Sequence, residues 1–144
     1  MTPEDLPLSQ AQLYCDARNA RLSPMRTRVF TAIASHGHPI GAYDIAAKLS
    51  QTGKRVNPVS VYRALDWLVS MGLACKINST KKYALGTFES AGPKRDVDII
   101  FLCGANNSAK RVHSPEIERK LMQIASTIDF KIESVTIEVN GRQL

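Results

Sequence analysis

Ser60, Tyr62 and Arg63 lie within four residues of one another and carry hydroxyl, aromatic and guanidinium groups. These groups suit hydrogen bonding to the base edges and phosphates of DNA. To act together they must lie on one side of a short helix whose other side is apolar and packs against the protein. A DNA major groove accepts a helix of this kind. The alternative is an ordinary amphipathic surface helix.

The surrounding sequence predicts such a helix over residues 57–72. Asn57 is a favourable N-cap, Pro58 suits the first helical position, and Gly72 suits a left-handed residue after the last turn. Four apolar side chains fall on one face at helical spacing: Val61, Leu65, Leu68 and Val69.

The chain has 144 residues and a net charge of +6, all of it in the first part. Residues 1–85 hold 11 Lys and Arg against 5 Asp and Glu, whereas residues 86–144 hold 8 of each. This asymmetry indicates that the first part binds a polyanion and that the second part has another role. The alternative is a solvated basic surface without a partner.

The first part has the order of a winged helix-turn-helix. The pattern predicts helices over 8–20, from Ser23 and Pro24 to about Gly37, and over 42–49, with a turn at 39–41. A polar loop at 51–57 carries Lys54 and Arg55 and leads into the helix described above.

After Gly72 the apolar residues alternate, which predicts a hairpin of strands 73–78 and 83–85. This hairpin would be the wing. Its tip carries Lys81 and Lys82, which would meet DNA phosphates; lysines at a hairpin tip are also a solubility device.

A Gly-, Ser- and Pro-containing segment at 86–96 is the one linker-like stretch. It predicts two domains, 1–85 and 97–144. The second reads as strand 97–103, strand 108–113, a helix beginning at Ser114-Pro115, and an alternating strand at 131–139. The fold class is therefore α+β, an N-terminal winged helix-turn-helix followed by a small α/β domain.

About fifty residues are too few to bury the apolar surface of the second domain alone. We therefore expect this domain to dimerise with a second copy of the chain. A two-fold homodimer would present two reading helices to the halves of a palindromic operator in double-stranded DNA.

Other classes of protein fit the sequence less well. No phosphate-binding glycine loop, paired carboxylates or nucleophile with a histidine partner is recognisable, so no enzyme is predicted. No apolar run could cross a membrane and no signal peptide is recognisable, so a cytoplasmic location is expected. The three widely spaced cysteines imply no disulfide framework. A winged helix used only for protein contact remains an alternative.

Four motifs resemble the ferric-uptake-regulator family, most nearly its zinc-uptake branch: RLSPMR at 21–26, AYD at 42–44, SVYRAL at 60–65 and KINST at 76–80. The resemblance runs nearly end to end. It implies a dimeric bacterial repressor with an N-terminal winged helix and a C-terminal α/β dimerisation domain. It also implies that Tyr43 and Arg63 contact DNA, with Tyr62 beside them.

The metal chemistry that the resemblance implies does not carry over. The family's structural zinc usually takes four thiolates from two CxxC pairs. At the first pair this sequence has Cys103-Gly104-Ala105-Asn106, and at the second it runs 141–144 as GRQL. One thiolate cannot replace four.

The sensing ligands are also missing. The cysteine position maps to Gly86, the histidine falls near Asp96, and the carboxylate maps to Arg111. Arg111 beside Lys110 is expected to repel a dication. His36 and His38 are interpreted as a surface turn. We therefore expect no metal and no other cofactor: a DNA-binding regulator without a metal switch, or a mixed-dimer partner of a metal-binding paralogue.

Overall fold

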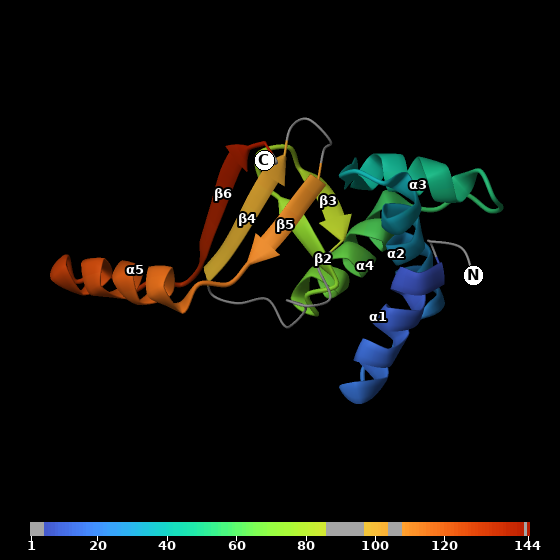
Figure 1. The fold of residues 1–144 in the computed structure, drawn as a ribbon. Helices are drawn as coiled ribbons and strands as arrows, with labels where there is room; N and C mark the ends of the chain where they lie inside the picture. Colours follow the sequence, from blue (N-terminus) through green and yellow to red (C-terminus); the bar gives the residue numbers. More distant parts are fainter. Residues whose placement is uncertain (1–4, 86–96, 104–107, 143) are drawn as a thin grey trace.

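The computed structural model describes residues 5–85, 97–103, 108–142 and 144. Its elements form a helical part with a small sheet and a second part with a three-stranded sheet (Figure 1). The elements of the first part, in chain order, are α1 (Asp5–Ala17), α2 (Pro24–His36), β1 (Ile40–Gly41), α3 (Ala42–Ser50), α4 (Pro58–Ser70), β2 (Ala74–Ile77) and β3 (Lys82–Leu85).

Local signals fix the ends of α2 and α4 as predicted. Ser23 accepts a hydrogen bond from the backbone N–H of Arg26, and Asn57 accepts one from Val59 at 2.9 Å. Gly37 and Gly72 follow the two helices with φ angles of 80° and 79°, in the left-handed region that favours glycine.

Two local predictions for the first part were wrong. The first helix runs from Asp5 to Ala17 and not over 8–20. The turn expected at 39–41 contains strand β1, which pairs antiparallel with β3 and completes a sheet of order β1-β3-β2. A two-residue strand has no periodicity of its own, because its existence depends on the distant hairpin beside it.

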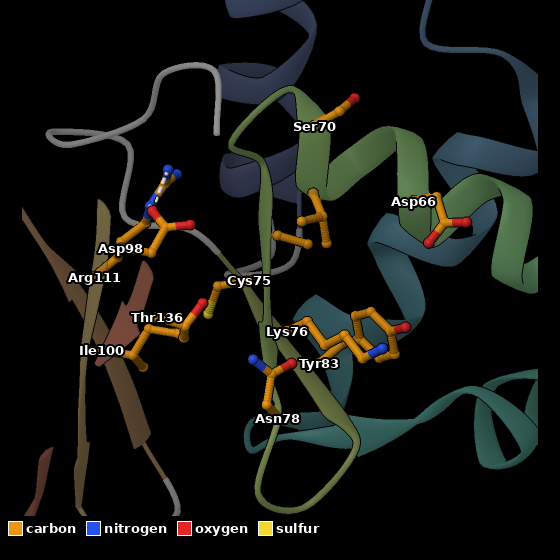
Figure 2. Close-up of a pocket in the computed structure, with 12 residues that line it drawn as sticks. Asp66, Ser70, Cys75, Lys76, Asn78, Tyr83, Asp98, Ile100, Arg111 and Thr136 are labelled. Atoms are coloured by element: carbon orange, nitrogen blue, oxygen red, sulfur yellow. Dashed lines mark hydrogen bonds and ion pairs between the residues drawn. The ribbon is translucent and has the colours of Figure 1, made fainter. Parts of the chain in front are cut away.

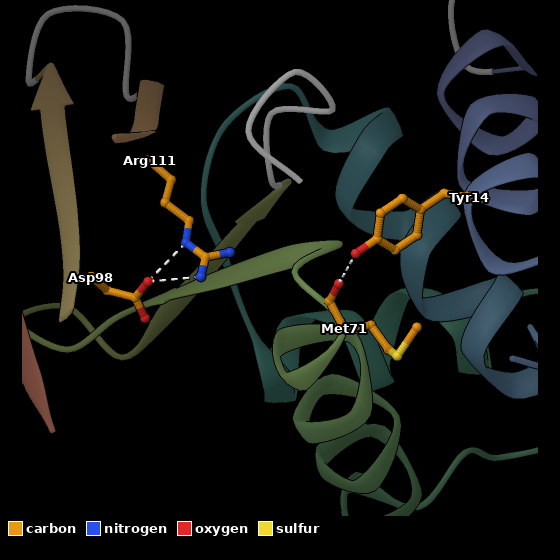
Figure 3. Close-up of polar contacts among 4 residues, drawn as sticks. All are labelled: Tyr14, Met71, Asp98 and Arg111. Carbon is orange, nitrogen blue, oxygen red and sulfur yellow. Dashed lines mark hydrogen bonds and ion pairs between the residues drawn. The ribbon is translucent and has the colours of Figure 1, made fainter. Parts of the chain in front are cut away.

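The core of the first part is one apolar cluster of α1, α2, α3, α4 and the adjoining hairpin, with Phe30, Ile45, Leu65 and Leu68 fully buried. The Tyr14 hydroxyl donates a 2.8 Å hydrogen bond to the Met71 carbonyl and ties α1 to the end of α4 (Figure 3). The result is a winged helix-turn-helix, as predicted.

The elements of the second part are β4 (Val97–Cys103), β5 (Ser108–Val112), α5 (Pro115–Thr127) and β6 (Val135–Gly141). The sheet order is β5-β4-β6, with β5 antiparallel and β6 parallel to β4. The last strand begins at Val135 and not at Lys131. Helix α5 begins at the Ser114 cap as predicted and projects away from the sheet (Figure 1).

The wing packs against the second sheet. Cys75, Ile77 and Ala84 on the hairpin form a second buried cluster with Ile100 of β4, bordered by Leu102 and Ala109. We call this contact between the β2–β3 hairpin and the β5-β4-β6 sheet the domain junction. The alternation predicted for β2 is incomplete, because Ala74 is buried in the first cluster as well as Cys75 in the second, while Lys76 is exposed.

The predicted linker at 86–96 lies outside the described residues. None of the helices in the described parts of the chain combines the length and apolar composition that crossing a bilayer requires.

Candidate nucleic-acid interface

Helices α3 and α4 bring two of the predicted DNA-contacting residues together. The rings of Tyr43 on α3 and Tyr62 on α4 meet edge to face, with centroids 6.2 Å apart. Tyr43 is 69% exposed and Tyr62 is 40% exposed. Both rings are therefore available to a partner while each restrains the other.

The outward side of α4 carries the other predicted groups. Ser60 and Arg63 are exposed, while Val61, Leu65 and Leu68 on the opposite side are buried in the core. The helix therefore presents hydroxyl, aromatic and guanidinium groups from a backbone held by packing. We call Tyr43, Ser60, Tyr62 and Arg63 the α3–α4 surface.

The predicted phosphate-binding cations lie in the loop before α4 and on the β2–β3 hairpin. Lys54 and Arg55 are exposed in the loop before α4, and Lys81 and Lys82 are exposed on the hairpin. Because Lys82 pairs with Gly41, the wing lies beside the start of α3. Figure 1 accordingly shows the start of α3 beside strand β3.

At the domain junction, Arg111 of β5 forms an ion pair with Asp98 of β4. The Arg111 Nε and Nη2 atoms both lie 2.8 Å from the Asp98 Oδ1 atom (Figure 3). The two side chains are only 8% and 13% exposed. In the strand register Arg111 lies opposite Ile100, so Asp98 is its diagonal neighbour on the same face of the sheet.

This pair borders a cavity of about 330 Å³ between the hairpin, the end of α4 and the second sheet. Figure 2 shows Cys75 of the hairpin facing Ile100 and Thr136 of the sheet across this junction. Burial raises the pKa of the Cys75 thiol to about 11, although the positive charge of Arg111 acts in the opposite direction. Cys75 is therefore a neutral thiol at physiological pH.

A second polar contact joins the wing tip to the second sheet. The backbone N–H of Ser79 donates a 3.1 Å hydrogen bond to the Glu138 Oε1 atom. Hydrogen bonding from Ser79 holds the pKa of Glu138 below its usual value of 4.5. The charged form of Glu138 is therefore the one that binds the wing.

The described residues contain no group of three or more His, Cys, Asp and Glu side chains that could hold a metal ion. His36 and His38 stack edge to face, with centroids 4.0 Å apart, and form a pair without a third such donor in that part of the chain. Gly86, Asp96 and 104–107 lie outside the described residues.

The structure gives Arg111 a partner that the sequence did not reveal. Arg111 beside Lys110 was expected to repel a dication, and Asp98 offsets the positive charge of Arg111 locally.

Sequence reasoning missed three features of these sites. Val59, on the first turn of α4, is 54% exposed beside the α3–α4 surface. Its spacing two residues before the buried Val61 is a signal that could have placed it on the outward side. The Asp98–Arg111 pair depends on the register between β4 and β5, the Ser79–Glu138 contact joins the wing tip to β6, and no local pattern reveals either contact.

Comparison with known proteins agrees with this architecture. A family model described as "Ferric uptake regulator family" matches residues 17–140. The zinc uptake regulation protein of Escherichia coli (strain K12) is 30% identical over 135 residues, which is 93% of this chain and 77% of that protein.

Solved structures agree over nearly the whole chain. A zinc uptake regulator complexed with zinc and DNA has a TM-score of 0.81 at 29% identity, covering 99% of this chain and 94% of that one. A crystal structure of holo XcZur has a TM-score of 0.76 at 26% identity, covering 94% of this chain and 93% of that one.

Proposed function

The chain belongs to the ferric uptake regulator family, on its zinc-uptake branch, and we propose that it is a transcriptional repressor that binds operator DNA as a homodimer without a regulatory metal ion. Residues 1–85 would bind the DNA and residues 97–144 would dimerise. No catalytic step is part of this proposal. The observation that carries it is the α3–α4 surface, which presents Tyr43, Ser60, Tyr62 and Arg63 on the outside of a packed helix pair.

These residue types suit different contacts with DNA. Arg63 can donate two hydrogen bonds to a guanine, whereas Ser60 and the tyrosine hydroxyls suit base edges or phosphates. Exposed cations in the preceding loop and on the wing would meet the phosphates on either side. The two-domain arrangement is similar to that of a regulator whose structure contains DNA, over 99% of this chain.

Replacing Arg63 tests the proposal most directly. The probe is a DNA site selected by the protein from a random pool, and the reference is a scrambled duplex of the same length. Arg63→Ala should weaken binding to the selected site by about 1–3 kcal/mol and change scrambled binding much less. Arg119→Ala, which removes an exposed arginine on α5, is the matched control.

Fluorescence anisotropy at several salt concentrations measures both affinities. Equal losses of affinity on the two duplexes would indicate that Arg63 contacts the DNA backbone and not a base. If the protein selects no DNA at all, or binds it without salt dependence, the winged helix serves protein contact instead.

The proposed homodimer rests on an apolar surface of the second domain. Helix α5 has no extensive contact with any other described helix or strand. Several large apolar side chains of this domain are at least 36% exposed: Phe101, Ile117, Met122, Ile124, Ile128, Phe130 and Val139. An exposed apolar surface of this size indicates an interface, and a second copy would cover it symmetrically.

Sedimentation equilibrium tests the homodimer. Ile124→Glu should shift the protein toward the monomer, because it places a charge in the proposed interface. Gln123→Glu adds the same charge one residue away, on the polar side of α5, and should leave the association unchanged. An Ile124→Glu protein that associates like the wild type would contradict the proposed interface.

The described residues offer a poor set of ligands for a metal ion that would control DNA binding. The relatives are named for zinc, but the junction of this chain holds a guanidinium paired to its carboxylate and a neutral thiol. Zinc prefers thiolate, imidazole and carboxylate ligands in groups of three or four. We propose that the apolar cluster around Cys75 and Ile100 and the Ser79–Glu138 contact hold the two parts together in its place.

The metal proposal has its own test. Protein purified without chelators should contain metal well below one ion per chain, and EDTA should leave its DNA affinity unchanged. Stoichiometric metal, or binding lost on chelation and restored by zinc, would contradict it.

A further inference from the structure

We propose that Val59 reads the 5-methyl group of a thymine in the operator, an inference that rests on the proposed DNA-binding function. Val59 is an exposed apolar side chain on the first turn of α4. Of the described side chains in residues 7–85, four large apolar ones are exposed: Leu13, Tyr43, Val59 and Tyr62. Three of these four therefore gather on α3 and α4.

Helical spacing places Val59 with the groups proposed to contact DNA. Val59 precedes Arg63 by four residues, so the two side chains are neighbours on one side of α4. Val61, two residues further on, lies on the opposite side and is fully buried. Val59 therefore faces whatever Arg63 faces and has no role in the core.

The position of Val59 is well defined. Asn57 accepts a 2.9 Å hydrogen bond from the backbone N–H of Val59, which fixes the first turn of the helix. Valine in a helix has one strongly preferred rotamer, so its two methyl groups point in a set direction. The first turn of a reading helix is the part that contacts base edges in helix-turn-helix proteins.

The groups exposed in the major groove indicate which base Val59 contacts. The exposed edges of guanine, cytosine and adenine present hydrogen-bonding groups there, whereas thymine adds an apolar methyl group. An apolar side chain without hydrogen-bonding atoms gains free energy in the groove by burying that methyl. A thymine beside the base read by Arg63 is therefore the partner that fits Val59.

Uracil substitution tests this contact, because uracil differs from thymine only by lacking the methyl group. In the selected DNA site, each thymine is replaced by uracil in turn. Wild-type affinity should fall about three- to five-fold at one thymine of each half-site, the effect of losing one buried methyl contact. The Val59→Ala protein should lose a similar factor on the unmodified site and show no further loss with uracil at that position.

Leu13→Ala is the matched control, because it truncates the exposed apolar side chain that lies on α1. It should keep the wild-type response to every uracil substitution, and circular dichroism should show all three proteins folded. If Val59→Ala keeps the wild-type uracil profile, or if no thymine is sensitive in the wild type, the thymine contact is overturned. Affinity that still depends on Arg63 would then leave the proposed function standing.

Discussion

The ion pair at the domain junction leads to a quantitative prediction about stability. Arg111→Met keeps the length and apolar stem of the side chain but removes the guanidinium. Asp98, which is only 13% exposed, then loses two 2.8 Å contacts and keeps its charge. The substitution therefore leaves a largely buried carboxylate without its cation.

Removing one partner of a buried ion pair costs about 3–5 kcal/mol. We expect a value near the lower end, about 3 kcal/mol, because Asp98 retains some contact with water. That is a large part of the 5–15 kcal/mol by which a typical domain is stable. The double variant Asp98→Leu with Arg111→Met removes both charges and should recover most of the loss, because two apolar side chains can pack where the pair was.

Urea denaturation followed by circular dichroism and by the fluorescence of Trp67 measures these differences. Protein concentration is held constant, because dimerisation would otherwise shift the apparent stability. Arg119→Met, at an exposed position on α5, should stay within about 0.5 kcal/mol of the wild type. An Arg111→Met protein as stable as the wild type, or a double variant no better than the single one, would refute the reasoning.

Three further predictions concern other groups. Lys81→Ala should reduce the slope of log affinity against log salt by about 1, which titrations at several salt concentrations would detect; an unchanged slope would remove Lys81 from the phosphate contacts. Because the folded-state pKa of Glu138 is depressed, its contact with Ser79 should stabilise the protein fully above pH 4.5 and be lost as the pH falls below that value. The stabilities of wild type and Glu138→Gln should therefore converge in acid, and a constant difference would contradict this. Cys75, with a pKa of about 11 and a buried thiol, should resist iodoacetamide in the native protein and react after unfolding, as mass spectrometry can show; rapid native labelling would contradict its burial.

The parts of the fold that local signals determine could be predicted from the sequence. Helix α4 lies where Asn57, Pro58 and Gly72 place it, because a cap, a fixed φ angle and a left-handed glycine act within a few residues. The outward direction of Tyr62 and Arg63 follows from the same periodicity. The chemical roles of these side chains toward DNA remain predictions.

The features that depend on distant segments could not be predicted. Strand β1 exists because β3 lies beside it, and the pairing of Asp98 with Arg111 requires the register of β4 and β5. The burial of Cys75 and Ile77 depends on strand β4, which begins at Val97, 20 residues after β2 ends. The neighbours of β1 and β2 are close in space and far away in the chain, whereas the Asp98–Arg111 pair depends on a register that neither strand sets alone.

The domain junction has a mechanical consequence for the proposed regulator. The sheet that would dimerise contacts the wing through Ile100 and through Glu138 at the tip, and its Asp98–Arg111 pair borders the same cavity as Cys75. The wing in turn belongs to the sheet that borders α3. If the second domains pair, the separation of the two α4 helices is therefore set by side-chain packing and not by a loose linker. Such a dimer would tolerate little variation in the spacing of operator half-sites, and weakening the junction should broaden the spacings that it accepts.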